Sequence, residues 1–258
     1  MKCFKYFPKN VKEELKYILF DIDDTITEGG KLKPEAYQAM WCLNENGFRL
    51  IPVTGRPAGW CDMIMRQWPV DAVVGENGAF CFYQKGKTIE TLLHPHCRSD
   101  TKEKLKQIRD VCLQKVPGCR VAKDQFARLY DLAVDFNEDE PKLGFDAAYK
   151  IQEICESFGA KAKVSSIHVN VWFGNYDKLS MVLFMFEKLY GEKNIKEKSL
   201  FFGDSPNDEP MFGFFDQTCA VANIKPFLSK LTHKPTYVTE KECGQGFAEA
   251  VNFLISIR

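Results

Sequence analysis

The chain has 258 residues, of which 45% are hydrophobic and 27% are charged, and its 35 basic residues balance 35 acidic ones. This composition is typical of globular proteins, and the balanced charge argues against a nucleic-acid or membrane partner. No apolar run reaches the roughly 18 residues of a membrane span. Residues 1–17 lack the apolar core of a secretory signal. We therefore expect a cytoplasmic protein, with monomer and homodimer both left open.

Ten cysteines are scattered singly along the chain, and no two of them form a C-x-x-C pair. This pattern favours reduced thiols in a protein interior over a disulfide framework. His94, His96 and Cys97 resemble half of a zinc site, but no second pair of ligands accompanies them. We therefore predict core thiols and no zinc.

The first third of the chain alternates between strand-like and helix-like patterns. Short apolar runs predict strands at residues 17–20, 50–53 and 72–74, and apolar stripes predict helices at 34–46 and 58–67. Alternating strands and helices predict a parallel sheet with helices on both faces.

The pattern changes near residue 84. Helices are predicted at 102–114 and 145–158, and a strand at 126–136. The clearest alternation follows, with Ile167, Val169, Val171 and Phe173 on one face and Ser166, His168, Asn170 and Trp172 on the other. Helices beside half-polar strands predict an α+β unit with an antiparallel sheet at residues 84–174.

The first pattern returns after residue 176. A helix is predicted at 178–190, strands at 199–202, 219–222 and 237–239, and a final helix at 246–257. We therefore predict a Rossmann-like, doubly wound α/β core formed by residues 1–83 and 175–258. The α+β unit is inserted between these two segments.

Acidic residues follow two of the predicted strands. Asp21 and Asp23 come directly after the first strand, and Asp204 and Asp208 follow the strand at 199–202. Ligands bind at the carboxyl ends of parallel strands, and carboxylates that converge there repel unless a cation or proton lies between them. An oxygen-only pocket of Asp21, Asp204 and Asp208 favours Mg²⁺. Helix capping is the alternative use of such residues.

Four segments, in this order, resemble the motifs of the haloacid dehalogenase superfamily of phosphohydrolases: Asp21-Ile22-Asp23-Asp24-Thr25, Pro52-Val53-Thr54-Gly55-Arg56, Lys178 and Gly203-Asp204-Ser205-Pro206-Asn207-Asp208. Glu76-Asn77-Gly78-Ala79 is similar to a segment of the type IIB branch, whose α+β cap is inserted at the same point. One departure is Asp24, where the family often has glycine.

The resemblance implies a phosphatase that works through an aspartyl-phosphate. Asp21 is the implied nucleophile, and Asp23 protonates the leaving alcohol and then deprotonates the attacking water. Thr54 and Lys178 hold the phosphoryl oxygens. The implied cofactor is Mg²⁺, bound by Asp21, the backbone carbonyl of Asp23, Asp204 and Asp208.

The expected substrate is a small phosphorylated metabolite, most plausibly a sugar phosphate, since type IIB relatives include sugar phosphatases. The candidate substrate-binding residues are Thr25, Arg56, Asn77, His168, Asn170 and Asn207. Each has a structural alternative, as a hydrogen-bonding residue of the fold or as part of a solvated strand face.

Two other functions remain open. A phosphomannomutase-like mutase uses the same two aspartates but needs a second phosphate site, for which the insert offers Arg98, Arg120 and Arg128. A non-catalytic phosphometabolite-binding protein predicts the loss of Asp21, Asp23 or Lys178, and all three are present.

Overall fold

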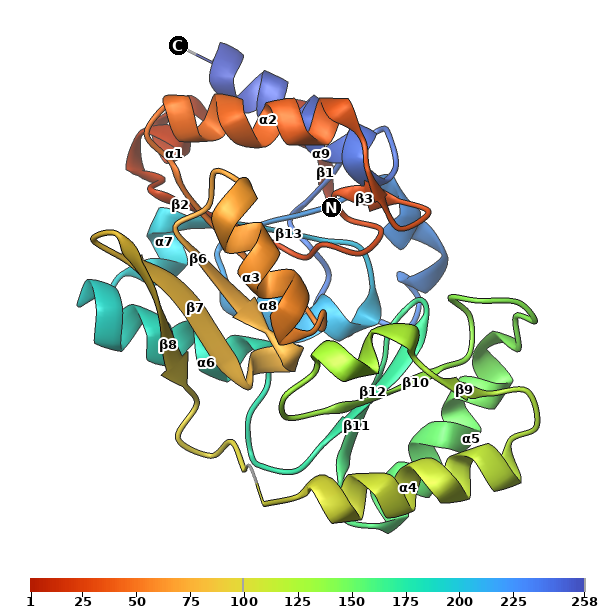
Figure 1. The fold of residues 1–258 in the computed structure, drawn as a ribbon. Coiled ribbons are helices and arrows are strands. Elements are labelled where there is room, and N and C mark those ends of the chain that lie inside the picture. The colour runs from red at the N-terminus through yellow and green to blue at the C-terminus, as the bar shows by residue number, and fades with distance from the viewer. Residues whose placement is uncertain (99, 258) are drawn as a thin grey trace.

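A computed structural model describes residues 1–98 and 100–257. It consists of a larger core and a smaller cap, which lie one above the other in Figure 1. The core contains β1 (Lys2–Cys3), α1 (Lys9–Glu14), β2 (Tyr17–Phe20), β3 (Thr27–Glu28), β4 (Lys31–Leu32), α2 (Pro34–Glu45), β5 (Arg49–Pro52), α3 (Ala58–Gln67), β6 (Ala72–Gly75), β7 (Phe80–Lys85), β8 (Thr88–Leu93), α6 (Lys178–Met185), α7 (Ile195–Lys198), β13 (Ser199–Gly203), α8 (Glu209–Phe214), β14 (Gln217–Ala220), β15 (Tyr237–Val238) and α9 (Cys243–Ser256). The cap contains α4 (Lys102–Lys115), β9 (Arg120–Val121), β10 (Leu132–Asp135), α5 (Gly144–Ser157), β11 (Lys161–Val164) and β12 (His168–Trp172).

The main sheet of the core is parallel. Its strand order is β1-β15-β14-β13-β2-β5, and every neighbouring pair runs in the same direction. A parallel bridge between Val53 and Val74 joins β6 to the β5 edge. The predicted doubly wound α/β core is therefore confirmed, and β2 and β13, the two strands followed by acidic residues, are adjacent.

Both faces of this sheet are buried. Successive side chains of a strand point to opposite faces, and in β2 Ile18 and Phe20 join the apolar cluster beneath α2, α3 and α9. Tyr17 and Leu19 join the cluster beneath α6 and α8. A strand buried on both faces reads as a continuous apolar run, which is why residues 17–20 show no alternation. Among the described residues, no helix has the length and apolarity to cross a membrane.

The cap is an antiparallel sheet with two helices on one face. Its strand order is β11-β12-β10-β9. Val169 and Val171 of β12 pack with apolar residues of α4 and α5. His168 and Asn170 point the other way, toward the core. The predicted α+β insert is confirmed, and its polar strand face lies over the acidic strand ends.

The predicted domain boundary at residue 84 falls inside β7. This strand and β8 form a hairpin that pairs with β6 of the core, in register from Ala72↔Tyr83 to Gly75↔Phe80. The sequence turns polar at Gln84 because the tip of the hairpin extends into solvent, while Phe80 stays buried. We propose that the cap begins after Leu93.

The predicted strand at 126–136 is largely wrong, because only Leu132–Asp135 forms a strand. Residues Lys123–Ala127 form a 3₁₀ helix instead. The backbone N–H groups of residues 129–131 donate to a carboxylate of the core, so they are not available to a neighbouring strand. The predicted helix at 178–190 ends as an α-helix at Met185 and continues as a π-helical turn to Tyr190.

Candidate active site

Three carboxylates meet at the carboxyl ends of β2 and β13. Oxygen atoms of Asp21, Asp204 and Asp208 lie within 4.8 Å of one another, and all three residues are buried. The N–H of Asp21 donates to the carbonyl of Phe202 at 3.0 Å, which extends the strand pairing to the first acid. The structure thus brings these three predicted ligands into one group.

Each carboxylate is held by neighbours. Asp208 Oδ2 accepts the N–H of Asp204 at 3.1 Å, and Asp204 Oδ1 accepts the hydroxyl of Thr25 at 2.9 Å. A Cβ on Gly203 would lie 2.6 Å from Asp208 Oδ2, so the loop requires glycine there. Thr25, a predicted substrate-binding residue, therefore orients Asp204 and does not line the pocket.

The turn after β2 explains the departure at Asp24. Its φ is 56°, in the left-handed region that glycine adopts most readily and aspartate tolerates. The family preference for glycine and this chain's Asp24 are two solutions to the same backbone requirement.

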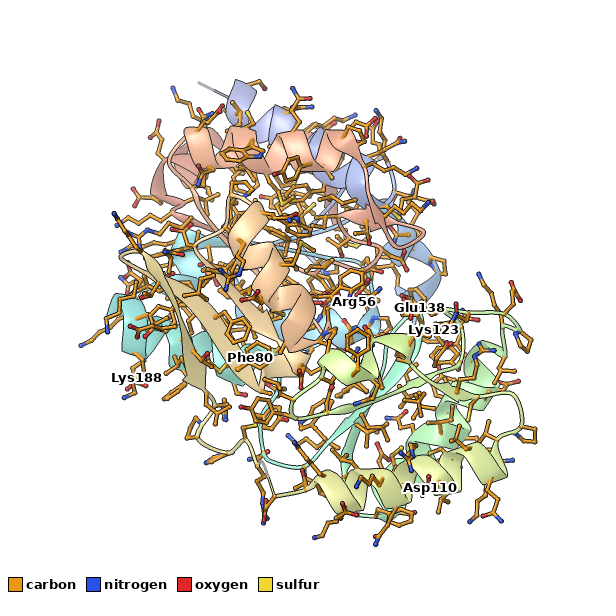
Figure 2. All side chains as sticks on the ribbon, in the orientation of Figure 1. Arg56, Phe80, Asp110, Lys123, Glu138 and Lys188 are labelled. Carbon is orange, nitrogen blue, oxygen red and sulfur yellow. The ribbon has the colours of Figure 1, made fainter. Side chains whose placement is uncertain are left out.

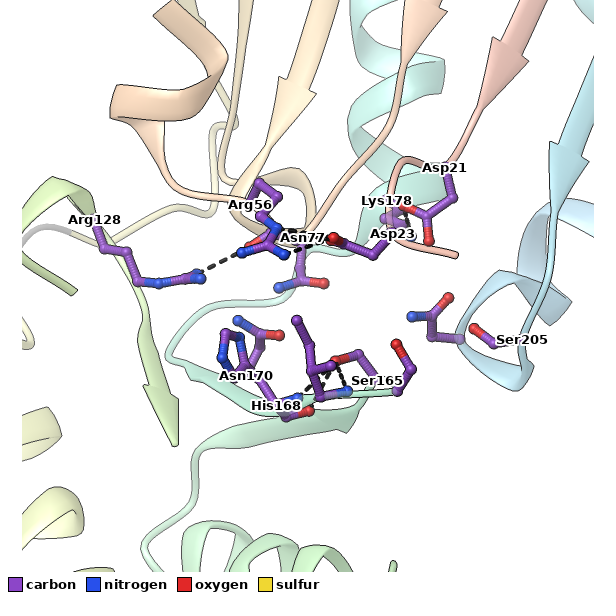
Figure 3. Close-up of a pocket in the computed structure, with 14 residues that line it drawn as sticks. Asp21, Asp23, Arg56, Asn77, Arg128, Ser165, His168, Asn170, Lys178 and Ser205 are labelled. Carbon is purple, nitrogen blue, oxygen red and sulfur yellow. Dashed lines mark hydrogen bonds and ion pairs between the residues drawn. The ribbon is translucent and has the colours of Figure 1, made fainter. Parts of the chain in front are cut away.

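Lys178 reaches the acidic group from the start of α6. Its Nζ lies 3.0 Å from Asp21 Oδ1 and 3.1 Å from Asp208 Oδ1. The helix begins there because Asp177 caps it, accepting the N–H of Ser180 at 2.8 Å while Ser180 Oγ accepts the N–H of Asp177. Figure 3 shows Asp21 and Lys178 side by side above the cap strand.

The acidic group carries more negative charge than Lys178 balances. Burial raises the pKa of Asp21 to about 7, with the charges of Asp208 and Asp23 adding to the effect and Lys178 opposing it. Burial, followed by the charges of Asp208 and Asp21, also raises the pKa of Asp204 well above its usual range. Burial opposes the charge on Lys178, but Asp208 and Asp21 outweigh it and raise the pKa of Lys178.

This donor set fits a hard divalent cation. The group offers only carboxylate oxygens, which Mg²⁺ prefers, and a cation would relieve the repulsion that raises the two pKa values. The carboxylate of Asp23, whose backbone carbonyl was the expected ligand, lies outside this group and faces Arg56.

Arg56 links Asp23 to the cap. Its Nε lies 3.0 Å from both carboxylate oxygens of Asp23, and its Nη2 lies 2.7 Å from Oδ1. Its Nη1 donates to Glu138 at 3.2 Å and approaches Asp124 at 3.5 Å, and both are cap residues. The guanidinium also lies over the Trp60 ring, 4.4 Å from its centroid. Figure 2 shows Arg56 and Glu138 close together where core and cap meet.

The polar face of β12 completes the pocket from the cap side. His168 and Asn170 both line it. His168 Nε2 lies 2.8 Å from Glu138 Oε2, and this hydrogen bond is the main reason that the pKa of Glu138 falls to about 2. Asn170 donates to Asp131 at 3.3 Å. Arg128 also lines the pocket and donates to Asp131 at 3.0 Å.

Two asparagines predicted to bind substrate each have a buried polar atom that lacks a hydrogen-bond partner in the described residues. Asn77 Nδ2 and Asn207 Oδ1 are buried, line the pocket and have no hydrogen-bond partner among residues 1–98 and 100–257. Buried polar atoms of this kind are rare in folded proteins, so they point to a polar ligand. Thr54 is also buried, but its Oγ1 accepts the N–H of Arg56 at 3.0 Å and it does not line the pocket.

Glu76, to which the motif resemblance assigned no role, joins the core to the cap. Its carboxylate accepts the N–H of Ala58 in the core at 3.1 Å. It also accepts three N–H groups of the cap, from Leu129 at 2.9 Å, Tyr130 at 2.7 Å and Asp131 at 3.2 Å. One core side chain therefore binds the cap backbone beside the pocket. In the sequence, the feature that could have indicated this role is the position of an acidic residue between two buried strands, β6 and β7.

The comparisons agree with this architecture. No curated protein sequence matches the chain. Its fold is similar to that of sucrose-phosphatase from Synechocystis, at 14% identity and a TM-score of 0.63, covering 93% of this chain and 98% of that one. It is also similar to the C-terminal domain of trehalose-6-phosphate phosphatase from C. albicans, at 17% identity and a TM-score of 0.71, covering 96% of each chain. A third similar structure is a sugar phosphatase of subclass IIB, at 16% identity and a TM-score of 0.65, covering 94% of this chain and 100% of that one.

The family model for haloacid dehalogenase-like hydrolases matches residues 18–122 and 123–251, which is most of the chain. These residues include the acidic strand ends, Lys178 and the whole cap. The expectation drawn from the motifs is therefore confirmed, and the chain belongs to the haloacid dehalogenase-like hydrolases.

Proposed function

We propose that this protein is a Mg²⁺-dependent phosphatase that hydrolyses a small phosphorylated metabolite, a sugar phosphate in the first instance. The observation that carries the proposal is the contact of Lys178 Nζ with Asp21 and Asp208 in a buried acidic group. A phosphate monoester is a dianion, and an anionic nucleophile approaches it only where positive charge offsets the repulsion. Asp21, Asp204 and Asp208 would hold Mg²⁺, which would supply further positive charge to the phosphoryl oxygens.

In the first half of the reaction, a carboxylate oxygen of Asp21 attacks phosphorus and the ester P–O bond breaks. Asp23 gives a proton to the leaving alcohol oxygen, and the phosphoryl group stays on Asp21 as an aspartyl-phosphate. Lys178 holds the phosphoryl oxygens and keeps Asp21 oriented. Splitting the hydrolysis in this way replaces one very slow displacement with two faster ones.

In the second half, Asp23 takes a proton from water, and the resulting hydroxide displaces phosphate from Asp21. Arg56 Nη2 lies 2.7 Å from Asp23 Oδ1 and so orients this carboxylate for the proton-accepting step. For the proton-donating step, we propose that the bound leaving group takes over part of the Arg56 contact. Arg56 therefore links the cap, the leaving group and the proton-transfer residue.

The sugar-phosphate assignment is supported by the polar cap face and by the similar structures. Hydroxyl groups need hydrogen-bond partners, and His168, Asn170 and Asn77 supply them around the pocket. A mutase is disfavoured because the cap arginines are already engaged. Arg98 pairs with Asp100, Arg120 with Asp135 and Arg128 with Asp131, so each already has an acidic partner.

The test is phosphate release from a panel of phosphate monoesters with Mg²⁺. We expect release from one or more sugar phosphates, its loss to background when EDTA removes the metal, and its recovery when Mg²⁺ is restored in excess. Isomerisation of hexose phosphates, without net phosphate release, would instead indicate a mutase. A folded protein that releases no phosphate from any ester and isomerises none would contradict both.

A further inference from the structure

The space around the acidic group divides into two connected parts. The pocket above Asp21 and Lys178 has a volume of about 20 Å³, enough for roughly one or two water-sized groups. A groove of about 640 Å³ opens beside it, between the cap and the core. Asp23, Arg56 and Ser166 line both spaces. We place the reacting end of the ester in the small pocket, beside His168 and Asn170, and the groove is where a bulkier leaving group has room.

The groove has an aromatic wall that spans the two domains. Phe145 and Tyr149 lie one turn apart on α5 of the cap, with ring centroids 6.4 Å apart. Phe145 also meets Phe227 of the core edge-on, with centroids 6.3 Å apart. All three residues line the groove. Phe145 is 38% exposed and Tyr149 is 44% exposed, so both rings have free area toward solvent.

Two cations lie along the same groove. Lys142 and Lys230 both line it, and neither side chain has an ion-pair partner in the part of the chain that the structure describes. Free ammonium groups beside exposed rings match a ligand with a flat ring face and oxygen acceptors on its edge.

We propose that the groove between α5 and residue Phe227 binds the distal ring of an extended phosphate ester, and that Phe145, Tyr149 and Phe227 determine this specificity. This inference rests on the proposed phosphatase function and names its substrate class: esters whose leaving group carries a ring beyond the phosphate-bearing unit. A glycosyl ring and an aryl ring share the flat face that stacks on an aromatic side chain. Esters with a glycosyl ring and esters with an aryl ring are therefore both tested, to show which kind of ring the groove binds.

The test compares kcat/KM for four esters: glycerol 3-phosphate, glucose 6-phosphate, trehalose 6-phosphate and 1-naphthyl phosphate. We expect the unaltered protein to prefer trehalose 6-phosphate or 1-naphthyl phosphate over glycerol 3-phosphate. Phe145→Ala and Phe227→Ala should each lower that preference about tenfold, the loss expected for one aromatic stacking contact. A drop confined to trehalose 6-phosphate assigns the groove to a glycosyl ring, and a drop confined to 1-naphthyl phosphate assigns it to an aryl ring.

Two further variants serve as controls for the proposed role of the groove. Phe158 lies at the far end of α5, is 40% exposed and does not line the groove, so Phe158→Ala is the matched control and should keep the preference. Phe145→Tyr retains the aromatic ring and should also retain the substrate preference. Phe145 and Phe227 contact each other across the domains, so a role in cap placement alone predicts an equal fall in kcat/KM for all four esters. That outcome would overturn the proposal.

Two outcomes separate this inference from the function on which it rests. Hydrolysis of glycerol 3-phosphate as fast as the ring-bearing esters would leave the phosphatase standing and remove the groove from its specificity. Failure to hydrolyse any ester with Mg²⁺ present would remove both.

Discussion

Replacing Asp21 with Asn is expected to lower kcat for phosphate release on the order of 10⁴-fold or more, as the loss of a nucleophile does in other enzymes. An amide oxygen carries no negative charge with which to attack phosphorus. The change also removes one of the three carboxylates of the acidic group. The measurement is phosphate release under saturating Mg²⁺ with the best ester of the panel.

Thermal unfolding of the same variant separates lost chemistry from lost structure. Asn loses the contact with Lys178, but it also removes one of three mutually repelling carboxylates, so we expect a similar Tm. Asp110→Asn is the matched control, because Asp110 is exposed on the cap and pairs with Arg109 at 2.7 Å, away from the acidic group. It should behave as the unaltered protein does. A folded Asp21→Asn protein with substantial activity would contradict the proposed role.

The acidic group was predictable because its causes are local. Each strand that leads into it is a buried, mostly apolar run. Asp21 and Asp204 directly follow these strands, and Asp208 comes four residues after Asp204. The rule that ligands bind at the carboxyl ends of parallel strands then places Asp21, Asp204 and Asp208 at one edge. The only further requirement was that the two strands be neighbours, and β13 does pair with β2.

The contacts of Arg56 were not predictable in the same way. Its partners Asp23 and Glu138 are 33 and 82 residues away in sequence. Their meeting depends on how the cap docks on the core, and no local pattern encodes that orientation. The motif located Arg56 near the site, whereas its ion pairs required the tertiary structure.

The position of the boundary predicted at residue 84, inside β7, has a related cause. A shift from apolar to polar residues shows where side chains become exposed. In β7 they become exposed toward the tip of the hairpin, but the chain returns along β8 before it leaves the core. The strand predicted at 126–136 failed because an apolar alternation does not show which acceptor the backbone N–H groups use. For Leu129, Tyr130 and Asp131 the acceptor is the side chain of Glu76.

Replacing Glu76 with Ala is expected to release the cap from the core at this contact. Glu76 is fully buried, and its loss leaves the N–H groups of Ala58, Leu129, Tyr130 and Asp131 without their acceptor. An unsatisfied buried donor costs about 1–3 kcal/mol, so with partial entry of water we expect a total loss of about 3 kcal/mol. Burial raises the pKa of Glu76 to about 7, while the amides of Leu129 and Tyr130 lower it.

Hydrogen exchange is the measurement that locates this loss. The amides of Leu129, Tyr130 and Asp131 should exchange at least roughly 30-fold faster, which corresponds to about 2 kcal/mol of lost local protection. Amides of β10, within the cap sheet, should stay protected, because the cap retains its own apolar cluster. Protection lost equally throughout the cap would mean that Glu76 supports the cap fold instead of its docking.

Two variants sharpen the interpretation. Glu76→Gln keeps the volume and one acceptor oxygen but turns an amide nitrogen toward N–H donors, so we expect an intermediate effect. Glu90→Ala is the control. Glu90 lies on β8 of the hairpin that follows Glu76, is partly exposed, and contacts Tyr83 and Lys85 of that hairpin. Its effect should stay within about 0.5 kcal/mol. Unchanged exchange at residues 129–131 in a folded Glu76→Ala protein would show that water replaces the carboxylate without cost. The docking of the cap would then depend on Arg56 and on Arg128, whose Nη1 donates to the carbonyl of Gly55 in the core at 2.9 Å.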